Sequence, residues 1–271
     1  MKHQLWAKLC AAHPKVARLN VSLFKFCLHG LGVLNFETAT ASGEEWLLRT
    51  VLARRLPPDR PPVLFDVGAN CGEYTLLLRA HFPAAEIHSF EPSPGSFAAL
   101  ARACPHSRNH LHNQALGAAA DELALYDYAD APAGSAHASL YPSVIQELHG
   151  RKSKPSLVRV QTLDAFCQEH SVAVIDFLKL DTEGHELKCL EGAGELLRQG
   201  RIRAVQFEFN QMNIHSRVFM QDFFRVLAGW SLYRLLPGGL LPLHPQATLE
   251  TNLFHFQNIV ALPDQSAAQT K

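Results

Sequence analysis

After residue 60, short apolar runs alternate with longer segments in which apolar residues recur every three or four positions. Runs of the first kind predict buried strands, and segments of the second kind predict helices. The expected strands are 63–67, 86–91, 110–115, 123–128, 157–161, 175–181, 202–209, 232–236 and 257–262. The expected helices are 73–81, 95–103, 162–170, 185–199 and 217–228. This alternation predicts an α/β fold with a parallel sheet covered by helices on both faces.

The N-terminal region has a different pattern, which predicts two or three helical pieces. Its most apolar stretch, 21–36, is interrupted by Lys25, His29 and two glycines, so it is too short and too polar to span a membrane. We interpret these helices as a cap on the main domain; a lid or a peripheral membrane contact is the alternative. The expected organisation is a helical cap over 1–50, one main domain over 51–264 and a disordered tail over 265–271.

Composition narrows the classes of function. The formal net charge is zero, so the chain as a whole has no electrostatic attraction to nucleic acid. Its 6 cysteines are scattered without a C-x-x-C pair, which favours a reduced, cytoplasmic protein over a disulfide framework or a zinc ribbon. His110 and His112 have strand spacing but no third ligand nearby, so we expect them to be structural.

Candidate chemistry begins where the first strand ends, in the sequence DVGANCG. Gly68 and Gly72 allow a tight turn that brings backbone close to a ligand at a helix N-terminus. Glu91 ends the next strand, in a position where an acid can accept both hydroxyls of a ribose. The dinucleotide pattern G-x-G-x-x-G is absent, and Asp66 at the start of the turn suits a cationic amino-acid group. These features favour S-adenosylmethionine over NAD.

Polar side chains also follow two later strands. Strand alternation places Lys179, Asp181 and Glu183 on one side of the segment FLKLDTEGHE. The run AVQFEFN has the same alternation, with Gln206, Glu208 and Asn210 as its polar residues. Because buried parallel strands are nearly all apolar, polar groups at their ends indicate a cleft. A structural ion pair between Lys179 and a carboxylate is the alternative interpretation.

Together, DVGANCGEYT, FEPSPGSFAAL, NQALG, KLDTEGHELKCLEGA and VQFEFN resemble the FkbM family of S-adenosylmethionine-dependent methyltransferases over roughly residues 42 to 260. The resemblance implies a Rossmann-like class I methyltransferase fold: a mostly parallel seven-stranded sheet flanked by helices, with one antiparallel edge strand. It also implies O-methylation of a hydroxyl on a small molecule, a sugar or a glycan.

The same resemblance implies roles for individual residues. The expected cofactor-binding residues are Asp66, Gly68, Asn70 and Gly72 around the methionine end, Glu91 at the ribose, Asn113, Ala115 and Leu116 near the adenine, and Asp181. The expected catalytic residues are Asp181, Glu183 and His185. A base would assist the poorly nucleophilic acceptor hydroxyl, and an imidazole has a pKa near neutrality by default. Mg²⁺ on Asp181, Glu183 and Glu208 is an alternative that we do not favour.

Two other classes of function stay open. One is a nicotinamide-dependent oxidoreductase on a similar sheet, and the other is a non-catalytic module that binds S-adenosylmethionine. The expected partner is a small-molecule or saccharide acceptor, with no nucleic acid, no transmembrane segment and a homodimer left open. The loop 129–156, which we expect to contact the acceptor, contains no motif that identifies it.

Overall fold

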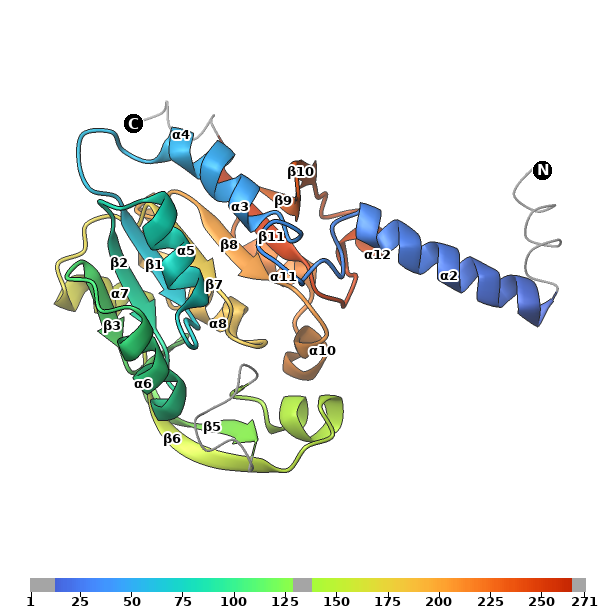
Figure 1. Cartoon of the computed structure of the whole chain (residues 1–271), viewed down its shortest axis with the longest axis horizontal. Coiled ribbons are helices and arrows are strands. Elements are labelled where there is room, and N and C mark those ends of the chain that lie inside the picture. The colour runs from blue at the N-terminus through green and yellow to red at the C-terminus, as the bar shows by residue number, and fades with distance from the viewer. Residues whose placement is uncertain (1–12, 129–137, 265–271) are drawn as a thin grey trace.

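A computed structural model describes residues 13–128 and 138–264, and its centre is an eight-stranded sheet (Figure 1). The strand order is β10-β9-β11-β8-β7-β1-β2-β3. These strands are β1 Val63–Val67, β2 Glu86–Phe90, β3 Asn109–His112, β7 Phe177–Leu180, β8 Val205–Glu208, β9 Trp230–Leu236, β10 Gly239–Pro242 and β11 Asn258–Pro263. The first twelve residues of the expected cap, the expected tail 265–271 and part of the expected acceptor loop, 129–137, lie outside the described residues.

The α/β architecture and the mostly parallel sheet are confirmed, since β3, β2, β1, β7 and β8 pair in parallel. The sheet has the expected antiparallel edge strand, and it also has an antiparallel strand in its interior. The antiparallel strand β11 lies inside the sheet, between β8 and β9. An additional strand, β10, forms the edge because Pro237 and Gly238 make a two-residue hairpin loop after β9. The hairpin thus adds one strand to the edge of the sheet.

Two expected strands belong to a separate sheet. Strands β5 (Asp121–Tyr128) and β6 (Ser153–Gln161) pair antiparallel, and β4 (Ala115–Leu116) pairs with β6. The expected strand 110–115 is divided between β3 and β4, because Asn113 bonds back to the end of β2 through the carbonyl oxygens of Glu91 and Pro92. This break directs the chain out of the main sheet.

Alternating residues of the central strands supply two apolar cores. Leu64, Ile87 and Phe177 face one core, and Phe65 and Leu178 face the other. The first core is covered by α5 (Glu73–His81) and by α3 (Glu44–Trp46) with the π-helix Leu47–Leu52. The second is covered by α7 (Leu163–Glu169), α8 (Glu186–Glu191), α9 (Gly194–Arg198) and α11 (Met220–Val226). Helices therefore cover both faces of the sheet.

Two expected helices are interrupted. The segment 185–199 forms α8 and α9, separated at Gly192, where a Cβ would lie 2.0 Å from the carbonyl oxygen of Gly117. The segment 217–228 begins as a helix only at Met220, because Arg217 has a left-handed φ of 57° and ends α10. The remaining helical elements are α4 (Ala53–Arg55), α6 (Pro94–Ala103), the π-helix Val144–Leu148, α10 (Met212–Ser216) and α12 (Thr248–Thr251).

The N-terminal helices occupy two different environments. The segment from α3 to α4 packs on the sheet and runs across position 50, the boundary expected from the sequence. Helix α2 (Pro14–Gly30) instead extends away from the body, and only its Leu28 is buried (Figure 1). No helix within 13–128 or 138–264 is long and apolar enough to cross a membrane.

Candidate functional site

A cavity of about 510 Å³ opens at the carboxyl ends of β1, β2, β7 and β8, where ligands gather in open α/β sheets. Most of the residues expected from the sequence line it, namely Gly68, Asn70, Glu91, Ala115, Leu116, Asp181, Glu183 and His185. Asp66, Gly72 and Asn113 are not among the lining residues. The topology thus brings the separate motifs to one place.

The turn after β1 depends on glycine at Gly68. Its φ is +84°, and a Cβ there would lie 1.7 Å from the carbonyl oxygen of Asp181. The backbone N–H groups of Gly68 and Ala69 both donate to the carbonyl oxygen of Phe90, at 2.9 and 3.0 Å. The ends of β1, β2 and β7 therefore meet at this turn.

Gly72 and Asp66 support the turn from behind. Gly72 has a φ of +95°, and a Cβ there would lie 2.6 Å from Cys104 Sγ and 2.9 Å from Leu100, so it permits close packing against α6. Asp66 is buried and accepts a 2.6 Å hydrogen bond from Thr75 Oγ1. Burial raises the pKa of Asp66 to about 6. Both residues shape the turn without contacting the cavity.

Glu91 connects the two strand ends. Its carboxylate accepts from the backbone N–H of Asn70 at 2.9 Å and from that of Ser93 at 2.8 Å. Burial raises its pKa to about 7 in spite of these two hydrogen bonds. Asn113 donates to the carbonyl oxygen of Glu91 at 2.8 Å and holds the strand end in place. Glu91 thus lines the cavity in a fixed orientation.

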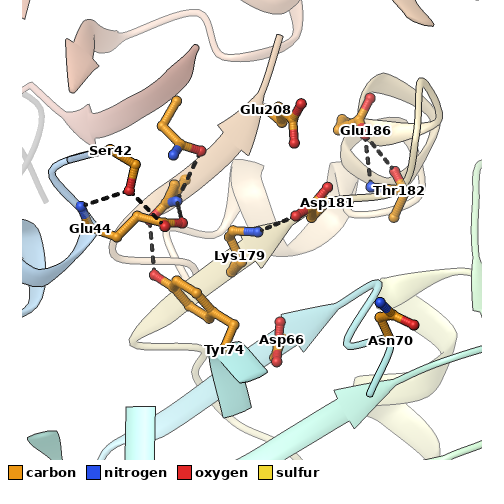
Figure 2. A network of polar contacts seen from close by, with 12 residues as sticks. Ser42, Glu44, Asp66, Asn70, Tyr74, Lys179, Asp181, Thr182, Glu186 and Glu208 are labelled. Atoms are coloured by element: carbon orange, nitrogen blue, oxygen red, sulfur yellow. Dashed lines mark hydrogen bonds and ion pairs between the residues drawn. The ribbon is translucent and has the colours of Figure 1, made fainter. Parts of the chain in front are cut away.

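Asp181 is held by a buried cation. Lys179 Nζ donates to Asp181 Oδ2 at 2.9 Å and lies 4.8 Å from the centre of the Tyr74 ring (Figure 2). The Lys179 side chain is 4% exposed, whereas that of Asp181 is 37% exposed, so the lysine lies behind and the carboxylate faces the cavity. Burial opposes the charge on Lys179, but Asp181, Glu44 and Asp66 outweigh it and raise its pKa. The ion pair considered from the sequence is present.

This ion pair belongs to a network that reaches the N-terminal segment. Tyr74 donates from its hydroxyl to Gln206 Oε1 at 2.9 Å, and Gln206 Nε2 donates to Glu44 Oε1 at 2.8 Å. Ser42 donates to the other oxygen of Glu44 at 2.8 Å (Figure 2). The start of α3 is therefore linked to the strand end that positions Asp181.

Glu208 is a cavity residue of a different kind. Burial, and then the nearby Asp181 and Glu183, raise its pKa well above the usual value. Its carboxyl group accepts from the side-chain amide of Asn210. Burial and these neighbouring acids favour the protonated form of Glu208, which can donate a hydrogen bond to a ligand.

His185 lies at the N-terminus of α8 and is buried. Its Nδ1 lies 3.3 Å from the Tyr141 hydroxyl, and a Cβ on Gly117 would lie 3.0 Å from its Nε2. Burial, and then Lys188, lower its pKa to about 4. The imidazole is therefore neutral at pH 7, and the expected default pKa near neutrality is wrong for this environment.

Glu186 was not singled out from the sequence, although it organises the loop after β7. Its Oε1 accepts from the backbone N–H groups of Thr182 at 2.8 Å and Gly184 at 3.2 Å. These bonds hold Glu183 with a left-handed φ of 53°, a conformation that needs local support. An acid in the first turn of a helix was the available signal.

Other lining residues come from distant segments. They are Leu34, Phe36, Gln114, Leu125, Asn210, Gln211, Met212, His255 and Phe256, among others. Within 13–128 and 138–264, no group of three or more His, Cys, Asp or Glu residues is arranged to hold a metal ion.

Residues 66–227 match the family model of the methyltransferase FkbM domain. The 31-O-demethyl-FK506 methyltransferase FkbM of Streptomyces tacrolimicus is 28% identical in an alignment of 178 positions, which covers 56% of this chain and 66% of that protein. The methyltransferase sdnD of Sordaria araneosa is 27% identical in an alignment of 165 positions, which covers 49% of this chain and 61% of that protein. The matches thus cover less than two thirds of either relative.

Solved methyltransferase structures also align with the chain. The plantazolicin methyltransferase BpumL in complex with SAH has 10% identity and a TM-score of 0.44, covering 96% of this chain and 94% of that chain. Precorrin-6y C5,15-methyltransferase from Geobacter metallireducens GS-15 has 9% identity and a TM-score of 0.41, covering 80% of this chain and 86% of that chain.

Proposed function

The chain belongs to the FkbM methyltransferase family, and on this premise we propose that it transfers a methyl group from S-adenosylmethionine to a hydroxyl of a small molecule, sugar or glycan. One observation carries the proposal. The same cavity is lined by Gly68, Asn70 and Glu91 and by Asp181 and His185, so that a cofactor-type turn shares it with groups able to bind or deprotonate a hydroxyl. The name of the Streptomyces relative, which specifies an O-demethyl substrate, supports oxygen as the acceptor atom.

The donor set fits the cofactor. Glu91 presents a fixed carboxyl group for the two ribose hydroxyls. Phe90, Ala115 and Leu116 supply an apolar surface suited to an adenine ring. Asp181 provides a carboxylate towards the cationic part of the ligand. When bound, S-adenosylmethionine supplies a methyl group already activated by its sulfonium.

The acceptor hydroxyl loses its proton as the methyl group is transferred. The neutral imidazole of His185 can take that proton throughout the physiological pH range, although a pKa of about 4 makes it a weak base. Asp181 offers a carboxylate oxygen as a hydrogen-bond acceptor, and protonated Glu208 is a donor that orients the acceptor. We propose that alignment of the reacting atoms supplies most of the rate enhancement.

Two measurements test this function. Calorimetry of the full chain with S-adenosylhomocysteine should give micromolar binding, and Glu91→Ala should weaken it by about 1.5–3 kcal/mol, the contribution of hydrogen bonds to a charged group. Labelled S-adenosylmethionine is then screened against glycosides and hydroxylated metabolites. The matched control is Glu86→Ala, which removes an acid from the opposite end of the same strand.

The two other classes predict different results. An oxidoreductase would bind NAD and not S-adenosylhomocysteine. A non-catalytic module would bind S-adenosylhomocysteine, but no acceptor would become labelled. Methyl transfer to nitrogen or carbon, with no labelled oxygen in the product, would overturn the proposed acceptor chemistry alone.

A further inference from the structure

Helix α2 is an amphipathic helix whose apolar side has no cover from the rest of the described chain. Leu19, Val21, Leu23, Phe24 and Phe26 are between 53% and 77% exposed. Single exposed apolar residues are ordinary on a protein surface, but a continuous set on one projecting helix marks an interaction site.

The polar side of α2 is basic. Lys15, Arg18, Lys25 and His29 are separated by 3, 7 and 4 residues, so they follow one stripe at 3.6 residues per turn. The sequence before Glu37 contains no Asp or Glu. All the acidic residues that balance the formally neutral chain therefore lie after α2. A stripe with three Lys and Arg residues and no acid, beside exposed Leu and Phe residues, is typical of helices that lie in the interface of an anionic membrane.

The direction of α2 is fixed by its C-terminal end. Gly32 has a φ of +78°, and a Cβ there would lie 2.6 Å from the carbonyl oxygen of Leu235 in β9, while Val33 is fully buried. Asn35 bonds to His29 through both its side-chain oxygen and its side-chain nitrogen, at 2.9 and 3.0 Å. These contacts attach the base of the helix to the sheet.

The same attachment leads to the rim of the cavity, which we define as Leu34, Phe36 and Phe256. The Leu34 N–H donates to the carbonyl oxygen of Phe256 at 2.8 Å, and the rings of Phe36 and Phe256 are 5.8 Å apart, edge to face. All three residues line the cavity, and Phe36 is also 64% exposed, which places it where the cavity opens to solvent. Exposed apolar side chains therefore lie at both ends of this attachment, Leu31 beside α2 and Phe36 at the rim.

We propose that α2 binds an anionic lipid surface in the plane of the interface and brings the rim of the cavity to the lipid. The apolar side chains enter the acyl boundary, and Lys15, Arg18 and Lys25 contact the acidic head groups. The consequence for the reaction rests on the proposed function: an acceptor that enters from the bilayer has an apolar part as well as a hydroxyl.

Sedimentation of the full chain with vesicles tests the binding without any methyl transfer. We expect binding to vesicles of phosphatidylcholine mixed with phosphatidylserine, and much weaker binding to phosphatidylcholine alone. Combined substitution of Lys15, Arg18 and Lys25 by Gln should reduce the partition coefficient on the mixed vesicles about 100-fold, and added salt should weaken wild-type binding. The matched control replaces the exposed Arg54, Arg55 and Arg102 by Gln and should bind like wild type.

A second pair of variants tests the apolar side. Phe24→Ser with Phe26→Ser should reduce binding about 100-fold, since two large side chains no longer enter the lipid. Leu157→Ser with Leu249→Ser, at positions 74% and 86% exposed elsewhere, should leave binding unchanged. The variant Phe36→Trp reports on the rim. The emission of the introduced tryptophan, obtained by subtracting the wild-type spectrum, should shift to shorter wavelength when mixed vesicles are added.

Four results would overturn the proposal. Equal binding to both vesicle types would show that the basic residues do not recognise the anionic lipid. Wild-type binding by the variant with Phe24→Ser and Phe26→Ser would show that the apolar side of α2 does not enter the lipid. A rim fluorescence unaffected by vesicles would separate the cavity from the lipid. Concentration-dependent dimerisation, lost in the Phe24 and Phe26 variant and unaccompanied by vesicle binding, would show that a second copy covers this face. None of these results depends on whether methyl transfer is observed.

Discussion

Replacing Lys179 by Met tests whether its buried charge holds the site together. The lysine is 4% exposed, and Asp181, Asp66 and Glu44 all raise its pKa. Removing the cation leaves buried Asp66 and the partly exposed Asp181 without compensation, and because Asp181 is 37% exposed the cost should lie below the roughly 3–5 kcal/mol found when a fully buried pair is broken. Met keeps most of the volume, so little of this loss comes from packing.

The chain offers a matched comparison at its surface. Lys188 donates to Glu191 at 2.7 Å, but the two side chains are 44% and 34% exposed. Lys188→Met should therefore change the free energy of unfolding by only about 0–1 kcal/mol. Urea denaturation of both variants measures the difference. Equal losses in the two variants would refute the reasoning that burial decides the size of the effect.

The pH dependence separates charge from packing. Without Lys179, the folded-state pKa of Asp66 should rise above its present value of about 6, further from the unfolded value. A carboxyl group with a raised folded pKa stabilises the protein below the unfolded pKa, and this contribution is lost as pH rises through the folded pKa. The variant should accordingly lose more stability at pH 8 than at pH 5. A loss that does not change with pH would assign the effect to packing alone.

Three further predictions concern the turn, the base and the histidine stack. Gly68→Ala should lower S-adenosylhomocysteine affinity and stability together, since its Cβ would collide with the carbonyl oxygen of Asp181; calorimetry and thermal melting measure both. If His185 takes the proton, wild-type kcat should be flat between pH 6 and 8, because its pKa of about 4 keeps it neutral there, and a rise through pH 6.5 would contradict this. His88 stacks on Phe65 and His112, and burial lowers the pKa of His88 to about 3. Below about pH 6.5 the unfolded chain takes up a proton on this histidine and the folded chain does not, so the free energy of unfolding should fall as the pH drops. His88→Phe should reduce that acid slope by about 1 kcal/mol per pH unit in urea titrations, and an unchanged slope would remove His88 as its cause.

Local patterns predicted most of the main sheet, because each strand is marked by residues adjacent in sequence. The turn at Gly68 and the acid at Glu91 were also readable, since their backbone requirements are local. Assignment of strands to sheets was not. The segments 123–128 and 157–161 have ordinary strand patterns, and only their pairing with each other separates them from the main sheet. Pairing depends on partners distant in sequence, which a periodicity does not encode.

The cavity rim also depends on contacts between segments that are distant in sequence, which local patterns do not predict. Phe36 and Phe256 lie 220 positions apart and have no chemistry that singles them out, yet their rings meet at the opening. Glu186 could have been found as a first-turn acid, but its three acceptor contacts with the loop before it depend on the path of that loop. Residues whose role depends on the path of a distant or neighbouring segment are therefore harder to predict than residues marked by a local motif.

The protonation state of an acid depends on its surroundings in the fold and cannot be predicted from the residue type alone. The sequence supplies Asp181 and Glu208 as similar acids at the ends of neighbouring strands, and the fold gives them opposite roles. Asp181 faces the cavity with a cation 2.9 Å behind it, a partner that favours its ionised form. Glu208 is partly buried and lies near Asp181 and Glu183, and burial and these two acids raise its pKa, which favours its protonated form. One acid can therefore attract a positive ligand while the other donates a hydrogen bond, and the difference arises from which strand Lys179 occupies.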